Sequence, residues 1–102
     1  MTLRLDRTVA GEPLVLLIEA LRCVEMDQRP DGSAHVSFEV PPEPGAAMHR
    51  AIMRIEAELL LDDADALEVG RREGRTADQR RHDAFVLLAV RVGEAVTNRT
   101  VA

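Results

Sequence analysis

Residues 75–92 read RTADQRRHDAFVLLAVRV, a cation-rich helix start that leads into a strongly apolar run. Thr76 and Gln79 have the spacing of a capping box, in which each side chain accepts a hydrogen bond from the other residue's backbone N–H. The apolar residues that follow recur at helical spacing. The stretch therefore predicts a long helix from Ala77 to about Thr97, against which the rest of the chain must pack.

One face of this helix forms an apolar stripe when the sequence is drawn at 100° per residue. Its members are Ala77, Ala84, Phe85, Leu88, Val92 and Ala95. Arg81 falls on the same face, and a core-side Arg needs a carboxylate partner. We expect a structural ion pair from Arg81 to Asp78 or Glu56. The alternative is that Arg81 captures an anion or a carboxylate of another molecule.

A second helix is predicted from about Gly45 to Leu61. Its main apolar stripe contains Met48, Ala51, Ile52, Ile55 and Leu59. A narrower stripe lies opposite it, and the last helix likewise has apolar residues opposite its main stripe. Two helices with second apolar faces exceed what a small monomer easily covers. We therefore expect a homodimer whose interface includes Met53, Leu60, Val86 and Val90. The alternative is that the remaining elements cover both faces within one chain.

Residues 24–40 have the pattern of a β-hairpin. Its turn, Arg29-Pro30-Asp31-Gly32, has the chemistry of a type I turn. From Ser33 to Val40 apolar and polar residues alternate, which predicts a half-buried antiparallel strand. Pro41-Pro42-Glu43-Pro44 then ends the strand and leads into the next helix.

The N-terminal segment has less pattern. Residues 14–22 are apolar on nearly all sides; a helix with Pro13 in its first turn is favoured, and a buried strand is the alternative. We expect one domain over residues 1–102, with residues 1–11 and 98–102 less ordered. The predicted fold class is α+β, an antiparallel β-hairpin packed against about three α-helices.

Composition excludes several classes of protein. All 13 basic residues are Arg, and the net charge of −5 disfavours nucleic-acid or membrane binding by the whole surface. Cys23 is the only cysteine, so no disulfide forms within the chain. No apolar run is long enough to span a bilayer. We therefore expect a cytoplasmic protein that does not contact membranes.

Residues with catalytic or metal-binding chemistry are scattered: His35, His49, His82 and Cys23. They lack the spacing of metal ligands. The acidic segment 62–65 is interpreted as a solvated helix end or continuation. His82 and Asp83 are neighbours on a helix, where adjacent side chains point about 100° apart, so we expect no catalytic pair. The sequence predicts no enzyme activity, no cofactor and no metal site.

One basic cluster is a candidate for contacting nucleic-acid phosphates: Arg71, Arg72, Arg75 and Arg80. Arginines near a helix N-terminus suit this role. However, Glu73 and Asp78 interrupt the cluster, and no exposed aromatic residue is available for stacking. A solvated linker is therefore the favoured interpretation.

The motif Arg75-Thr76-x-x-Gln79-Arg80-Arg81-x-Asp83-Ala84 resembles the signature of a large actinobacterial family, called the 13E12 repeat family or domain of unknown function 222. The predicted hairpin and Pro42-Glu43-x-Gly45-Ala46-Ala47 resemble further elements of that family, so the resemblance spans about residues 21–95. The family commonly carries a C-terminal HNH nuclease domain, and no His-Asn-His motif follows the signature here. The resemblance implies the accessory domain alone and brings no biochemical role with it. From the residues we expect a non-enzymatic interaction or regulatory module with an unidentified protein partner; the alternative is a nucleic-acid-binding accessory domain.

Overall fold

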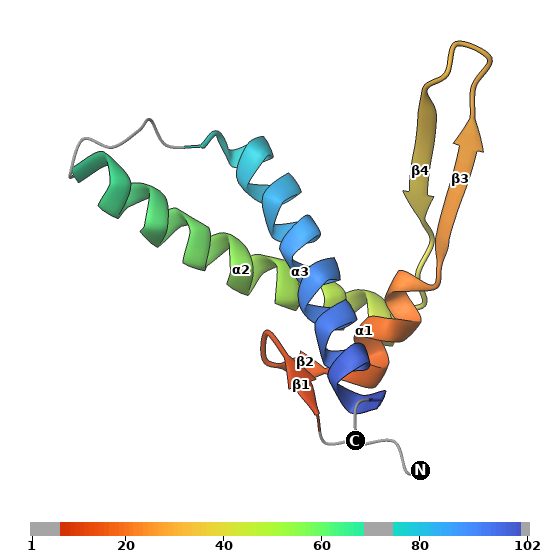
Figure 1. Cartoon of the computed structure of the whole chain (residues 1–102), viewed down its shortest axis with the longest axis horizontal. Coiled ribbons are helices and arrows are strands. Elements are labelled where there is room, and N and C mark those ends of the chain that lie inside the picture. Colours follow the sequence, from red (N-terminus) through yellow and green to blue (C-terminus); the bar gives the residue numbers. More distant parts are fainter. Residues whose placement is uncertain (1–6, 69–74, 101–102) are drawn as a thin grey trace.

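The computed structural model describes residues 7–68 and 75–100 and contains two antiparallel β-hairpins and three α-helices (Figure 1). In chain order the elements are β1 (Thr8–Val9), β2 (Glu12–Pro13), α1 (Leu14–Leu21), β3 (Val24–Gln28), β4 (Ala34–Phe38), α2 (Pro42–Glu68) and α3 (Ala77–Thr100). The α+β class is therefore confirmed. Residues 14–21 are helical, so the alternative of a buried strand there is wrong. None of the helices in the described ranges is long and apolar enough to cross a membrane.

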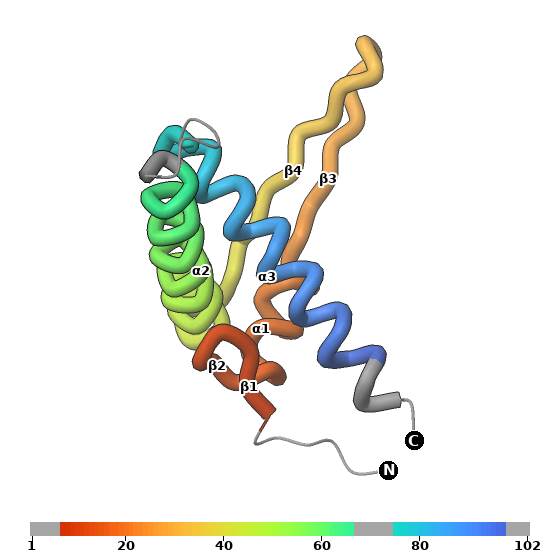
Figure 2. Tube along the Cα trace, turned by 60° about the vertical axis from the view of Figure 1, so that its left-hand side comes forward, coloured from red at the N-terminus to blue at the C-terminus, as the bar shows by residue number. Residues whose placement is uncertain are grey.

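The hydrophobic core lies where the three helices meet. Its buried members are Leu14, Leu17, Ala47, Ala51, Ile55, Leu59, Ala84, Leu88 and Val92. The main apolar stripes predicted for the two long helices supply most of this core. Small alanines at the crossing let the helix axes approach closely, and Figure 2 shows α3 crossing beside α2 and α1.

Both long helices extend beyond their predicted limits. α2 begins at Pro42, because prolines are tolerated in a first turn, and continues to Glu68 through the acidic segment. α3 begins at Ala77 and ends at Thr100. Its capping box is confirmed: the Thr76 N–H donates to Gln79 Oε1 at 2.9 Å, and the Gln79 N–H donates to Thr76 Oγ1 at 3.2 Å.

Residues 7–13 form the small β1–β2 hairpin, although the sequence predicted less order for residues 1–11. Its two-residue loop is Ala10-Gly11, and both residues have positive φ, 50° and 79°. Such loops match the twist of a hairpin, and Gly is the residue that adopts this conformation most readily. A side chain at Gly11 would also collide with the guanidinium of Arg54. The sequence pattern missed this hairpin because its strands have only two residues each.

A buried carboxylate anchors this hairpin to α2. Glu12 Oε1 accepts a hydrogen bond from Arg50 Nη2 at 2.8 Å, and Glu12 Oε2 accepts hydrogen bonds from Arg50 Nε and from Arg54 Nη1. Arg54 Nη1 also donates to the Ala10 carbonyl at 2.9 Å. The hydrogen bond from Arg50 is the main cause that lowers the pKa of Glu12 to about 2. Glu12 is therefore ionised and paired at neutral pH.

The β3–β4 hairpin has the predicted turn. The Gly32 N–H donates to the Arg29 carbonyl at 3.0 Å, and Gly32 has a φ of 91°. Asp31 Oδ1 supports the turn by accepting from the Ser33 N–H at 2.9 Å. The strand register pairs Val24 with Phe38 and Met26 with Val36.

The burial predicted for this hairpin is wrong. Nine of its ten strand residues are exposed, and Phe38 alone among them is partly buried. The physical reason is that the hairpin projects away from the helices (Figure 1). Near its base, the Phe38 ring meets the Phe85 ring edge to face, with centroids 5.4 Å apart. The apolar side of the hairpin thus continues outward from the core without being covered by it.

Candidate functional site

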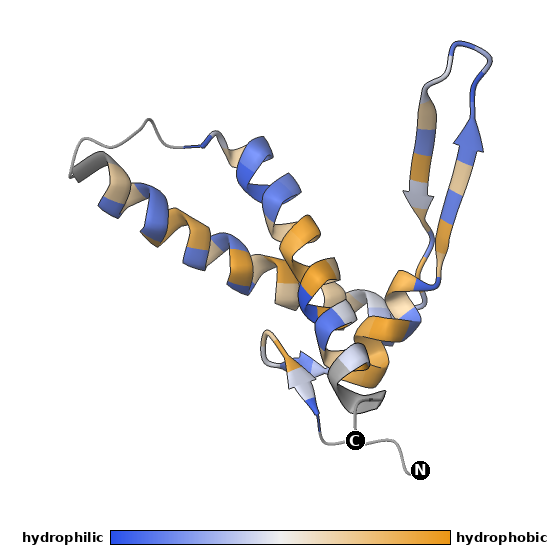
Figure 3. Ribbon diagram, viewed as in Figure 1, coloured by the Kyte–Doolittle hydropathy of each residue, from blue (hydrophilic) through white to orange (hydrophobic). Residues whose placement is uncertain are grey.

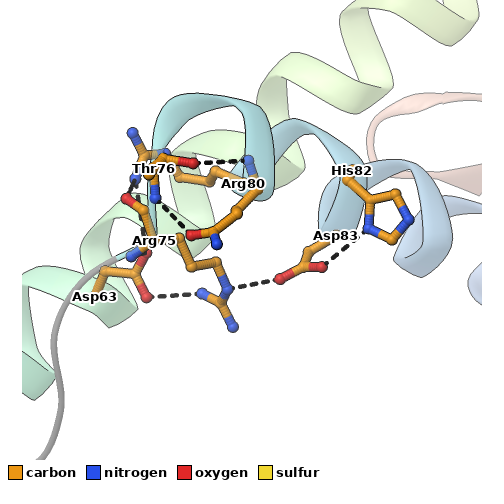
Figure 4. A network of polar contacts seen from close by, with 7 residues as sticks. Asp63, Arg75, Thr76, Arg80, His82 and Asp83 are labelled. Carbon is orange, nitrogen blue, oxygen red and sulfur yellow. Dashed lines mark hydrogen bonds and ion pairs between the residues drawn. The ribbon is translucent and has the colours of Figure 1, made fainter.

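The predicted nucleic-acid cluster contains a buried ion-pair network where α2 and α3 face each other (Figure 4). Asp63 is the central carboxylate, and only 3% of its side chain is exposed. Its Oδ1 accepts a hydrogen bond from Arg75 Nη1 at 2.7 Å, and its Oδ2 accepts from the Arg75 backbone N–H at 3.2 Å. Arg80 Nη1 lies 3.6 Å from the same Oδ2. Asp63 was predicted to be solvated and is instead the anchor of this network.

Arg75 and Arg80 are therefore engaged within the chain. Arg80 Nη1 also donates to the Arg75 carbonyl at 3.1 Å, and only 18% of the Arg80 side chain is exposed. Arg75 and Arg80 are separated by four residues along the chain. Both side chains reach Asp63 because α3 begins beside this residue of α2. Arg71 and Arg72, the other members of the predicted cluster, lie outside the described residues.

The network reaches Asp83 and His82 along the surface of α3. Arg75 Nε donates to Asp83 Oδ2 at 2.7 Å, and His82 Nδ1 lies 3.3 Å from Asp83 Oδ1. The hydrogen bond with His82, and then that with Arg75, lower the pKa of Asp83 below its usual range. His82 and Asp83 thus contact each other although they are neighbours on the helix, and the expectation that they form no catalytic pair stays a prediction. His82 itself is exposed to solvent.

Arg81 forms an ion pair with α2 on the surface. Its Nε donates to Glu56 Oε1 at 2.9 Å, and 65% of its side chain is exposed. Glu56 is one of the two partners expected from the sequence, but the predicted core-side position of Arg81 is wrong. Arg81 lies on the exposed side of α3, and the first buried residue of that helix is Ala84. The same two helices are joined by Arg91, whose Nη2 donates to Glu58 Oε2 at 2.9 Å.

The four residues expected at an interface are all exposed. The exposed fractions of Met53, Leu60, Val86 and Val90 lie between 45% and 53%. They occupy the sides of α2 and α3 that face away from the shared core, as the helical wheel predicted. We call these four the outer-helix residues. Leu61 on α2 and Val15 on α1 are exposed as well.

A further apolar surface was missed by the sequence because its residues were assigned to the chain's own core. It lies on the β3–β4 hairpin, where Val24, Met26 and Val36 are exposed and Met26 reaches 68%. Figure 3 shows apolar residues alternating with polar ones along these strands, far from the apolar cluster at the helix junction. The signal that marks this surface is the strict alternation itself, which shows that one face is apolar but not what covers it.

The described residues do not bring together a group of three or more His, Cys, Asp or Glu side chains that could hold a metal ion. The charged clusters instead combine carboxylates with arginines, which neutralise each other. The structure thus has two kinds of notable site: ion-pair clusters that join elements of the chain, and apolar surfaces that residues 7–68 and 75–100 leave exposed.

Comparison with known proteins places the chain in a family. No curated protein and no solved structure matches it. The family model described as "Domain of unknown function (DUF222)" matches residues 18–100, which is more than half of the chain and includes β3, β4, α2 and α3. The resemblance noted from the signature at residues 75–84 is thereby confirmed, and the chain belongs to the DUF222 family.

Proposed function

We propose that this domain is a non-enzymatic protein-interaction or regulatory module that acts as a homodimer. The observation that carries the proposal is the number of large apolar side chains left in contact with water. They are Val15, Val24, Met26, Val36, Met53, Leu60, Leu61, Val86 and Val90. Exposed apolar area costs roughly 25 cal/mol per Å² relative to burial, and monomers seldom leave large contiguous areas of it uncovered.

The dimensions of the chain support association. Its Cα radius of gyration is 16.0 Å, whereas a compact domain of this length has a radius of about 13 Å. Its accessible surface is 7326 Å², whereas a compact monomer of its mass exposes about 5,700 Å². A second copy that covers part of this surface would bring each chain closer to the usual ratio of surface to mass.

The charged clusters favour binding over catalysis. Their arginines and carboxylates satisfy one another, and His82 is bonded to Asp83 rather than to a hydroxyl or thiol that it could activate. Among the residues the structure describes, no nucleophile is hydrogen-bonded to this imidazole. A module of this kind, with Cys23 as its only cysteine, fits the cytoplasm.

Nucleic-acid binding is the alternative function, and it has less support. Arg75 and Arg80 would have to leave Asp63 before they could contact phosphates, which would leave a buried carboxylate unpaired. Only arginines outside the described residues, Arg71 and Arg72, are left from the predicted cluster.

Sedimentation across low to high micromolar concentration, at low and at high salt, tests the proposal. We expect a dimer whose dissociation constant barely responds to salt, because apolar burial is not screened. A chain that remains monomeric at the highest concentration would overturn the proposal. A parallel titration with duplex DNA at low salt addresses the alternative, because binding that weakens steeply with added salt would support it.

A further inference from the structure

We propose that the apolar face of the β3–β4 hairpin is the two-fold contact of the homodimer, covered by the same face of a second copy of this chain. This inference rests on the proposed function and specifies which surface performs it. The outer-helix residues would then remain outside the two-fold contact.

The strand register defines this face. Residues directly opposite each other in an antiparallel pair project to the same side of the sheet. Three opposite pairs make up one face: Val24 with Phe38, Met26 with Val36, and Gln28 with Ala34. The other face carries Glu25, Asp27, His35 and Ser37. The hairpin therefore has an uncharged, mostly apolar face and a polar, acidic face, and we call the first the hairpin face.

The contact between Phe38 and Phe85 shows that the hairpin face begins at the core. Phe38 belongs to this face and packs on α3 at the base of the hairpin. Farther out, Met26 and Val36 continue the same face beyond the reach of the helices, where both are exposed. The missing cover must therefore come from outside the described part of this chain.

Charge distinguishes the hairpin face from the other exposed apolar surfaces. A two-fold contact brings a surface against its own copy, so any charge on it meets a like charge. None of the six side chains on the hairpin face is charged. The outer-helix residues have charged neighbours on the same side of their helices: Glu56 lies three residues after Met53 and four before Leu60, and Glu94 lies four after Val90. The hairpin face is accordingly the surface that two copies can share without burying charge.

The low stability of an isolated two-stranded sheet also favours a dimer contact through the hairpin face. An isolated hairpin is marginally stable in water, and a hydrophobic layer packed on one face is the usual remedy. Pairing two hairpins edge to edge would widen the sheet but leave its apolar face in water. Stacking the faces would bury them, with the sheets about 10 Å apart as in a β-sandwich.

Residue-specific cross-linking tests this arrangement. The starting chain carries Cys23→Ser, which removes the only native thiol. Met26→Cys and Val36→Cys each add one thiol to the hairpin face, and the matched controls Glu25→Cys and Asp27→Cys each add one to the opposite face of the hairpin, on β3. Each variant is treated with a short bismaleimide linker, and the covalent dimer is followed over time. All four positions are exposed, so folding should survive, and helical circular dichroism verifies that it does.

We expect Met26→Cys or Val36→Cys to form the covalent dimer about ten times faster than both controls, because proximity raises the effective concentration of the second thiol. Equal rates on the two faces would overturn the inference. A dimer in sedimentation that cross-links at none of the four positions would also overturn it, while leaving the proposed function intact. A monomer in sedimentation would overturn both.

A second pair of variants tests the contact without added thiols. Met26→Ser should raise the dimer dissociation constant at least tenfold, whereas Met53→Ser, the same change at an outer-helix residue, should leave it within about twofold. The reverse pattern would move the contact to the helices and overturn the inference.

Discussion

Leu17, Ile55 and Leu88 are at most 1% exposed where the three helices meet, whereas Met26 and Val36 on the β3–β4 hairpin are about half exposed or more. Both regions are built from regularly spaced apolar residues. At the helix junction these residues meet one another, while on the hairpin face they meet solvent. The difference teaches that periodicity records which side of an element is apolar, but not whether the rest of the chain packs against that side.

The two regions also differ in their polar interactions. In the helical region, carboxylates of low exposure hold separate elements together: Glu12 joins the β1–β2 hairpin to α2, and Asp63 joins α2 to the start of α3. In the β3–β4 hairpin the hydrogen bonds to side chains are local, from Ser33 to Asp31 within the turn. We therefore expect mutations to have large effects on folding in the first region and small effects in the second.

The largest effect is expected from Leu88→Ala. This change leaves a cavity among three helices and should lower the free energy of unfolding by about 2–5 kcal/mol. The same substitution at Leu61, which is exposed on α2, is the matched control and should cost well under 1 kcal/mol. Urea unfolding followed by circular dichroism measures both. Equal losses would show that the helix junction is not the folding core.

The next effect is expected from Asp63→Asn. The amide keeps the shape but removes the charge that Arg75 and Arg80 share, so unfolding should become easier by about 2–3 kcal/mol. Asp65→Asn, an exposed position one half-turn away on the same helix, should change stability by less than about 0.5 kcal/mol. If the two variants unfold alike, the network does not stabilise the α2–α3 arrangement.

A smaller, pH-dependent effect is expected from Glu12→Gln. At neutral pH it should cost about 1–2 kcal/mol, a value reduced because Arg50 and Arg54 are half exposed to solvent. The folded-state pKa of Glu12, about 2, lies below its unfolded value, so its contribution is present above about pH 4.5 and is lost as the pH falls towards 2.

Measuring the free energy of unfolding as the pH is lowered checks the sign of this effect. The native chain should lose more stability than Glu12→Gln between pH 5 and pH 2, in the window between the unfolded and folded pKa values. Glu19→Gln on the exposed side of α1 serves as the control and should follow the native chain. Parallel curves for the native chain and Glu12→Gln would contradict the role of the Glu12 pair.

The sequence alone was sufficient where structure depends on neighbours along the chain. The capping box at Thr76, the turn at Gly32 and the main stripes of α2 and α3 each depend on residues within a few positions of one another, and all were predicted. The family was also identified from a contiguous motif.

The other features of the structure depend on how separate elements are placed in space, which a single sequence does not reveal. The wheel placed Arg81 in the core because it treats a helix as packed along its whole length, whereas the buried residues of α3 begin at Ala84 and Arg81 pairs with Glu56 on the surface. Asp63 looked like a solvated acid because the arginine that pairs with it is 12 residues away. The hairpin face looked like core because alternation does not reveal where the hairpin points.

Removing one cap should have a modest effect. Thr76→Ala deletes the oxygen that accepts from the Gln79 N–H and should cost about 1 kcal/mol. Thr76→Ser keeps the hydroxyl and should restore most of the loss. Because the cap belongs to the helical region, the loss should appear in the main unfolding transition. A serine variant as unstable as the alanine variant would mean that the methyl group, and not the hydroxyl, matters.

The smallest effect on the fold is expected from Val36→Thr. Threonine keeps the β-branched shape favoured in strands and replaces one apolar group of the hairpin face with a hydroxyl. In dilute solution, where the chain is monomeric, Val36 contacts solvent, so the free energy of unfolding should change by no more than about 0.5 kcal/mol. At high concentration the same variant should unfold more easily than the native chain, because association stabilises only the folded dimer. A large loss in dilute solution would mean that the hairpin folds back onto the helices, and the contrast between the two regions would then disappear.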